Sequence, residues 1–178
     1  QVKNRPQWRV LRGGSQSYLS PLCAPFEKSI RTNCAVTVVL REEGQSPRLR
    51  THQGEDLSFD DIVIAAHADQ AMAILSDIDD TESSVLSEFP YSENEVVLHT
   101  DTRLLPRKHL AWSSWNYRLR ESNSRATLTY NMNILQGINS PENFCVTLND
   151  TDAVDPITIL GEYRYAHPQF TTKGIAAQ

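Results

Sequence analysis

Three stretches near the start of the chain decide how it folds: WRVLRGGSQSYL (residues 8–19), IRTNCAVTVVLREE (residues 30–43) and LSFDDIVIAAHADQAMAIL (residues 57–75). The first places a double glycine ahead of a helix that Ser15 can cap. The second is rich in β-branched residues, which is typical of a strand. The third starts as an apolar run and continues into a helical pattern. Their order indicates one connected unit.

The same stretches predict a hairpin and a buried strand. Residues 8–11 read as a short first strand, and residues 35–41 and 48–52 are expected to pair across a turn that contains Gly44. Residues 62–66 (IVIAA) are apolar on both faces, which is typical of a parallel strand covered on both sides. We therefore expect this run to be a buried parallel strand.

The middle of the chain predicts two helices. Ala71, Met72 and Leu75 share one face of the helical pattern that follows the apolar run. Asp79 and Glu82 have the spacing of a capping box, in which each side chain bonds the other residue's backbone amide. A second helix is therefore expected to begin after Asp79.

Strands dominate from about residue 95 onwards. Residues 126–133 and 144–149 alternate apolar and polar side chains with a period of two. Residues 95–101 and 110–117 are further expected strands, and residues 159–165 form either a strand or a helix, before a last short helix that Thr172 caps. The predicted fold class is α+β: a largely antiparallel mixed sheet of about four or five strands with flanking helices, plus a small N-terminal β-layer.

Composition places the chain among ordinary globular proteins. It has 178 residues, of which 39% are hydrophobic and 22% are charged. No apolar run reaches the roughly 18 residues needed to span a bilayer, and the first residues lack the apolar core of a signal peptide. The three cysteines are widely spaced, which suits free thiols in a reducing compartment. We therefore expect a cytoplasmic protein without a membrane span.

The charge is arranged in blocks. Residues 1–50 carry nine Lys and Arg against three acids, residues 51–102 carry thirteen acids and no Lys or Arg, and residues 103–125 carry six basic residues against one acid. Such blocks either steer a charged substrate or form solvated faces of a soluble protein. The net charge of −5 argues against a nucleic-acid partner, which a basic surface would attract.

The later segments follow the first three in a recognisable order. They read VVLHTDTRLLPRKHLAWSSWNY (96–117), TYNMNILQGI (129–138), FCVTLND (144–150) and EYRYAHPQF (162–170). This succession resembles the flavin-containing amine oxidase superfamily, and more narrowly its bacterial branch of predicted NAD/FAD-binding proteins. The resemblance implies that residues 1–75 belong to an FAD-binding lobe, which is incomplete because it lacks GxGxxG. It also implies that residues 76–178 form the sheet and helices of the substrate domain.

The resemblance points to four residues near the cofactor. It implies that Val36 contacts the adenine end of FAD through its backbone, although a strand valine in a core reads the same way. Gly13 and Gly14 either permit close backbone approach or form a tight turn. Ala66 ends the apolar run, where ligands gather in open α/β sheets, but small residues there also suit tight packing.

His99 is the candidate catalytic residue. The resemblance implies a lysine on the corresponding strand of many amine oxidases, bonded through water to flavin N5. This chain reads VVLHTD there, so a histidine replaces the lysine, and amine oxidation is put in doubt. A histidine can act as a general base or position water near neutral pH, and it can also be an ordinary hydrogen-bonded strand residue.

Trp115 and Tyr117 are the candidate substrate-binding residues. On a strand they share a face, whereas Trp112 would point to the other side. Aromatic side chains suit either the wall of a substrate cavity or core packing. The five histidines show no metal-ligand spacing, so no metal site is expected.

The functional hypothesis is therefore a fragment of an FAD-dependent oxidoreductase of the amine oxidase or desaturase type. Its small-molecule substrate would transfer a hydride to flavin N5, and the isolated chain would retain little FAD. The alternative is a stand-alone α+β module that binds a ligand or a protein without redox activity. The unpaired apolar run at residues 62–66 also predicts a homodimer of the isolated chain.

Overall fold

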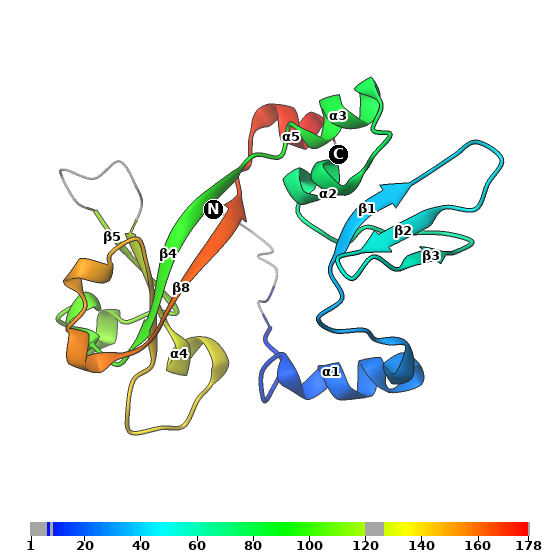
Figure 1. The fold of residues 1–178 in the computed structure, drawn as a ribbon. Helices are drawn as coiled ribbons and strands as arrows, with labels where there is room; N and C mark the ends of the chain where they lie inside the picture. Colours follow the sequence, from blue (N-terminus) through cyan, green and yellow to red (C-terminus); the bar gives the residue numbers. More distant parts are fainter. Residues whose placement is uncertain (1–6, 8, 120–126, 178) are drawn as a thin grey trace. The chain divides into compact units, whose positions relative to one another are not determined.

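The computed structural model describes residues 7, 9–119 and 127–177 (Figure 1). The chain forms two compact units. The first combines Gln1–Glu27 with Glu93–Tyr165, and the second combines Lys28–Ser92 with Ala166–Gln178. The boundary expected near residue 75 divides the chain by function and stays a prediction.

The first unit is built on a five-stranded sheet. Its strands are β4 (Tyr91–His99), β5 (Trp115–Arg118), β6 (Thr127–Asn131), β7 (Cys145–Leu148) and β8 (Ile159–Pro168), in the order β5-β6-β7-β4-β8. The pairs β5–β6, β6–β7 and β4–β7 are antiparallel. Thr100 bonds Thr158 and Gln169 bonds Pro90 at opposite ends of β4 and β8, so that pair is antiparallel too. The predicted α+β class and the antiparallel sheet are confirmed.

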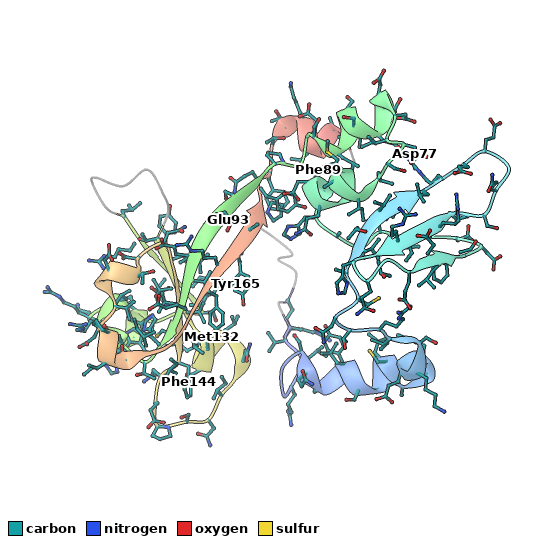
Figure 2. All side chains as sticks on the ribbon, in the orientation of Figure 1. Asp77, Phe89, Glu93, Met132, Phe144 and Tyr165 are labelled. Carbon is teal, nitrogen blue, oxygen red and sulfur yellow. The ribbon has the colours of Figure 1, made fainter. Side chains whose placement is uncertain are left out.

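Short helical elements precede or connect these strands. They are α1 (Gln16–Cys23), α4 (Met132–Gln136) and the 3-10 turns Ala24–Ser29, Thr102–Leu104, His109–Ala111, Thr151–Ala153 and Pro156–Thr158. Figure 2 labels Met132 at the start of α4 and Phe144 just before β7. The amide of Met132 donates to the carbonyl of Phe144 at 2.9 Å, which closes the loop between β6 and β7.

Several expectations in this unit were wrong. In the short strand expected at residues 8–11, residues 9–11 form no strand, and residue 8 lies outside the described residues. The strand expected at 110–117 begins only at Trp115, because Trp112 instead donates from its indole Nε1 to the carbonyl of Pro106 at 2.7 Å. The Ser113 hydroxyl also bonds the carbonyl of Trp115. These bonds hold the preceding residues in a loop. Ser15 does precede α1, but its side chain makes no capping hydrogen bond.

The second unit contains a small sheet and three helices. Its strands β1 (Val36–Leu40), β2 (Arg48–Thr51) and β3 (Asp56–Ser58) form an antiparallel sheet in sequence order, and its helices are α2 (Ala68–Ile74), α3 (Asp80–Leu86) and α5 (Thr172–Ala176). The expected hairpin is therefore confirmed, with one further strand. The cap of α5 is Thr171, one residue before the expected Thr172.

The capping box of α3 is confirmed. The Asp79 carboxylate accepts a hydrogen bond from the amide of Glu82 at 2.7 Å, and the Glu82 carboxylate accepts one from the amide of Asp79 at 3.2 Å. Arg41 on the segment after β1 binds Glu82 at 2.6 Å and Asp77 at 3.1 Å. The start of α3 is thus tied to the small sheet.

The buried strand expected at residues 62–66 is wrong. This segment forms no strand, Ile62 and Ile64 are half-buried, and Val63 is 90% exposed. An isolated parallel bridge joins Val39 of β1 to Leu75 instead. A strand exists only when another backbone pairs with it, and no described segment pairs with this run.

The best-packed apolar cluster lies under the five-stranded sheet. Val97, Leu104 and Val154 are buried together, with Ala153 and Ile159 packed against them. The expected alternation in β6 and β7 is real, but the polar members are the buried ones. These are Thr127, Thr129, Asn131 and Thr147. The apolar members lie on the other side of the sheet.

Candidate functional site

Eight apolar side chains project from one side of the five-stranded sheet. Alternate residues of a strand share a side, and the strand register aligns these residues in two rows. The rows are Leu98–Val146–Tyr130–Trp115 and Val96–Leu148–Leu128–Tyr117. We call this set the apolar face. Figure 2 shows the side chains on this sheet, with Glu93 labelled on β4 and Tyr165 on β8.

Burial of the apolar face falls towards the edge strand β5. Val96 on β4 is buried, and the apolar-face residues of β6 and β7 are half-buried. Trp115 is 45% exposed and Tyr117 is 62% exposed. They share a face, as expected, and they leave apolar surface in contact with solvent. Such surface is suited to contact with a ligand or another protein.

The opposite side of the sheet carries a buried hydrogen-bond network. His99 Nε2 lies 2.7 Å from Thr147 Oγ1, which lies 2.9 Å from Thr129 Oγ1. The side-chain amide of Asn116 donates to the carbonyl of Thr129 at 3.2 Å. His99, the expected catalytic residue, therefore lies on the opposite side from Trp115, and its catalytic role stays a prediction.

The contacts of His99 define its tautomer. Its Nδ1 accepts a hydrogen bond from the backbone amide of Asp101 at 3.1 Å, so Nδ1 carries no proton. The proton is on Nε2, which donates to Thr147. Burial lowers the pKa of His99, and the nearby Asp101 carboxylate opposes that shift. A neutral ring that is fully enclosed in this way suits a structural role.

Asp101 anchors the loop after β4. This buried carboxylate accepts hydrogen bonds from the Arg103 guanidinium at 2.6, 2.9 and 3.1 Å, and from the backbone amides of Arg103 and Asp155, each at 2.9 Å. The hydrogen bonds from Arg103 are the main reason that the pKa of Asp101 lies well below its usual range. Asp101 therefore remains a carboxylate at neutral pH and holds Arg103 in place.

A cavity of about 570 Å³ lies beside the edge strand β5. Its lining residues come from β5 and from the loop before it: Arg103, Leu104, Leu105, Pro106, Arg107, Ala111, Ser113, Trp115, Asn116, Tyr117 and Arg118. The three arginines were not singled out from the sequence. The basic block over residues 103–125 was the available signal, but it does not say which of its side chains share a cavity.

The expected cofactor residues lie in both units. Gly13 and Gly14 belong to the first unit and have φ angles of 84° and 74°, which only glycine adopts without strain. Val36 lies in the second unit at an irregularity at the start of β1. Ala66, also in the second unit, is exposed just before α2. Their role in binding FAD stays a prediction.

Comparisons with known proteins found a similar fold among the solved structures. No protein-family model and no curated protein matches the chain. The solved structure of a CLA-producing fatty acid isomerase from P. acnes is similar, with a TM-score of 0.54 and 15% sequence identity. The match covers 85% of this chain and 39% of that chain. This chain thus shares its fold with part of an enzyme and spans well under half of that enzyme's length.

Two further features bear on the kind of site. No helix in the described ranges is long and apolar enough to cross a membrane. Among the same residues, no group of three or more His, Cys, Asp or Glu side chains is placed to hold a metal ion. The apolar face and the cavity beside β5 are therefore the features from which a function can be argued.

Proposed function

We propose that this chain is part of an FAD-dependent oxidoreductase of the amine oxidase or desaturase type, and that its five-stranded sheet forms one wall of the substrate cavity. The apolar face carries this proposal. Two rows of side chains line one side of the sheet, and the row ends Trp115 and Tyr117 keep 45% and 62% of their surface exposed. Substrate sites are predominantly apolar and aromatic, with few polar groups.

The nature of the apolar face suggests the class of substrate. Its members are aliphatic or aromatic, and the polar groups among them are the hydroxyls of Tyr117 and Tyr130 and the indole N–H of Trp115. A substrate that rests on it therefore has an extended apolar part. The similar solved structure is that of a fatty acid isomerase, which supports an acid with a hydrocarbon chain as the substrate.

Part of the glycine turn is already engaged in hydrogen bonds within the chain. The amide of Gly14 donates to the carbonyl of Leu11, that of Ser17 to Gly14 and that of Tyr18 to Ser15. A Cβ at Gly14 would meet nothing within 4 Å, so the positive φ explains this glycine without a close ligand. Val36, Ala66, Gly13 and Gly14 remain the candidate contacts of FAD in this chain.

An absorbance spectrum tests the cofactor. The complete open reading frame that contains this chain is expressed and reconstituted with FAD, and we expect the visible bands of bound flavin. The isolated chain is expected to bind FAD weakly, as followed by flavin fluorescence, because it offers no pyrophosphate site. If the complete protein holds no flavin after reconstitution, the proposed oxidoreductase function is wrong. The alternative, a binding module without redox activity, would then be favoured.

A matched pair of variants tests the substrate wall. In the complete protein Trp115→Ala removes a large apolar contact, so we expect KM for a hydrocarbon substrate to rise by about tenfold or more. Trp115→Phe keeps an aromatic ring and is expected to change KM much less. Equal KM values for Trp115→Ala and the unaltered protein would place the substrate elsewhere.

A further inference from the structure

We propose that the cavity beside β5 binds the carboxylate group of an apolar acid, which Arg103, Arg107 and Arg118 receive while its hydrocarbon part extends onto the apolar face. This inference rests on the proposed function and deepens it, since it names the polar end of the substrate. The cavity has a volume of about 570 Å³ and contains three guanidinium groups in its lining.

The lining of this cavity is positively charged. Three of its eleven residues are arginines, and none is acidic. A guanidinium group offers five N–H donors in a planar fork that matches the two oxygens of a carboxylate. The remaining lining residues are apolar or neutral.

Two of the arginines are held in place by buried carboxylates. Asp101 binds Arg103 through Nε and Nη2, and leaves Nη1 without a hydrogen bond to any residue that the structure describes. Arg118 Nη1 lies 3.5 Å from a carboxylate oxygen of Asp150, whose side chain is 1% exposed. Because Asp101 is buried and hydrogen-bonded to Arg103, it orients that guanidinium group before a ligand arrives and reduces the entropy lost on binding.

Arg107 is the lining arginine whose positive charge has no carboxylate partner in the described part of the chain. It pairs with no acidic side chain among residues 7, 9–119 and 127–177, whereas Arg103 and Arg118 each have a carboxylate partner. It follows Leu104, Leu105 and Pro106 on the loop that forms one side of the cavity. An anion in the cavity would therefore gain most from Arg107.

Two aromatic residues connect the cavity to the apolar face. Trp115 and Tyr117 line the cavity and also end the two rows of apolar side chains. A ligand with its charged end at the arginines can therefore continue along these rings onto the sheet. This continuity favours an acid with a hydrocarbon chain over a small inorganic anion.

Binding of decanoate tests this site on the 178-residue chain, followed by isothermal titration calorimetry without flavin. Decan-1-ol has the same chain without the charge, and inorganic phosphate has charge without the chain. We expect decanoate to bind at least about tenfold more tightly than either. Arg107→Gln is expected to weaken decanoate binding by about tenfold and to leave decan-1-ol binding unchanged. Arg164→Gln, an exposed arginine of β8 outside the cavity, is the matched control.

The outcomes separate this inference from the proposed function. Equal affinities for decanoate and decan-1-ol, or equal losses in Arg107→Gln and Arg164→Gln, would overturn the carboxylate site. Phosphate that binds as tightly as decanoate would show that the cavity recognises charge alone and would overturn the substrate class. Failure of the complete protein to hold FAD would overturn the proposed function but leave the decanoate result standing, since that measurement needs no flavin.

Discussion

His99 on β4 and Thr147 on β7 are joined by a hydrogen bond of 2.7 Å between Nε2 and Oγ1, and at most 1% of either residue is exposed. In the strand register His99 lies opposite Cys145, so this bond runs diagonally to the residue two positions further along β7. The hydrogen bond joins the neighbouring strands β4 and β7 on the buried side of the sheet.

The first prediction is that His99 makes the fold sensitive to mild acid. Its folded pKa lies below the value of 6.5 at which the unfolded chain takes up the proton. The unfolded state therefore binds more protons below that pH, and the free energy of unfolding falls as pH is lowered from about 7.5 to about 5.5. Urea unfolding across this range measures it. His99→Gln, which cannot titrate, should give a flatter dependence, and equal slopes in both proteins would contradict this account.

The second prediction concerns the Thr147 hydroxyl. Thr147→Val keeps the shape but removes the partner of His99 and Thr129, which leaves buried polar groups unpaired. We expect a loss of about 1–3 kcal/mol in the free energy of unfolding. Thr147→Ser keeps a hydroxyl and should retain more stability. A Thr147→Val variant as stable as the unaltered protein in urea unfolding would show that these hydrogen bonds add nothing to the free energy of unfolding.

The third prediction concerns the cap of α3. Asp79→Ala removes the carboxylate that accepts from the Glu82 amide, and we expect a loss of about 0.5–2 kcal/mol. Ser84→Ala, at an exposed position of the same helix, serves as the control and should change stability by less than about 0.5 kcal/mol. Thermal unfolding monitored by circular dichroism compares them. A cap variant as stable as the control would mean that tertiary contacts alone hold this helix.

The fourth prediction is self-association through residues 62–66. Ile62 and Ile64 line a cavity of about 400 Å³ in the second unit, and Val63 is almost fully exposed. An apolar extended segment without a backbone partner favours pairing with another copy, so we expect a twofold dimer of the isolated chain. Light scattering at several concentrations should show it, and Val63→Lys should weaken it. If the chain is a monomer and the amides of this segment are protected from hydrogen exchange, the segment already has its hydrogen-bond partners within the same chain.

The fifth prediction separates two roles for His99 in the complete protein. The sequence predicts that its removal slows flavin reduction with flavin content unchanged, whereas its enclosed position opposite the apolar face predicts an unchanged rate. The structure leads us to expect the second outcome for His99→Gln. Stopped-flow reduction with the true substrate distinguishes them, because slow reduction at full flavin content would establish a role in the chemistry.

Local patterns predicted most of the elements. The hairpin of β1 and β2, the capping box at Asp79 and the strands β4, β6 and β7 follow from periodicity and turn residues, which act over a few positions. The prediction of a strand at residues 62–66 was wrong because a strand needs a second backbone to pair with. Five apolar residues do not indicate whether such a partner exists. The strand expected at residues 110–117 was predicted too long for a related reason. The hydrogen bond from the Trp112 indole to the carbonyl of Pro106 holds Trp112 in the loop before β5.

The sequence by itself determined that the segments containing β6 and β7 form strands with one apolar and one polar side, because backbone geometry alone sends alternate side chains to opposite faces. The strand expected at 126–133 ends earlier, at Asn131, because Met132 begins helix α4. Only the tertiary structure decided that the polar side is the buried one. Threonine and histidine side chains can be buried when they form hydrogen bonds with each other. Their partners come from strands far apart in the chain, since His99 and Thr147 are separated by 48 positions. The same pairing left Trp115 and Tyr117 exposed on the other side, beside three arginines whose positions the tertiary fold alone brought together.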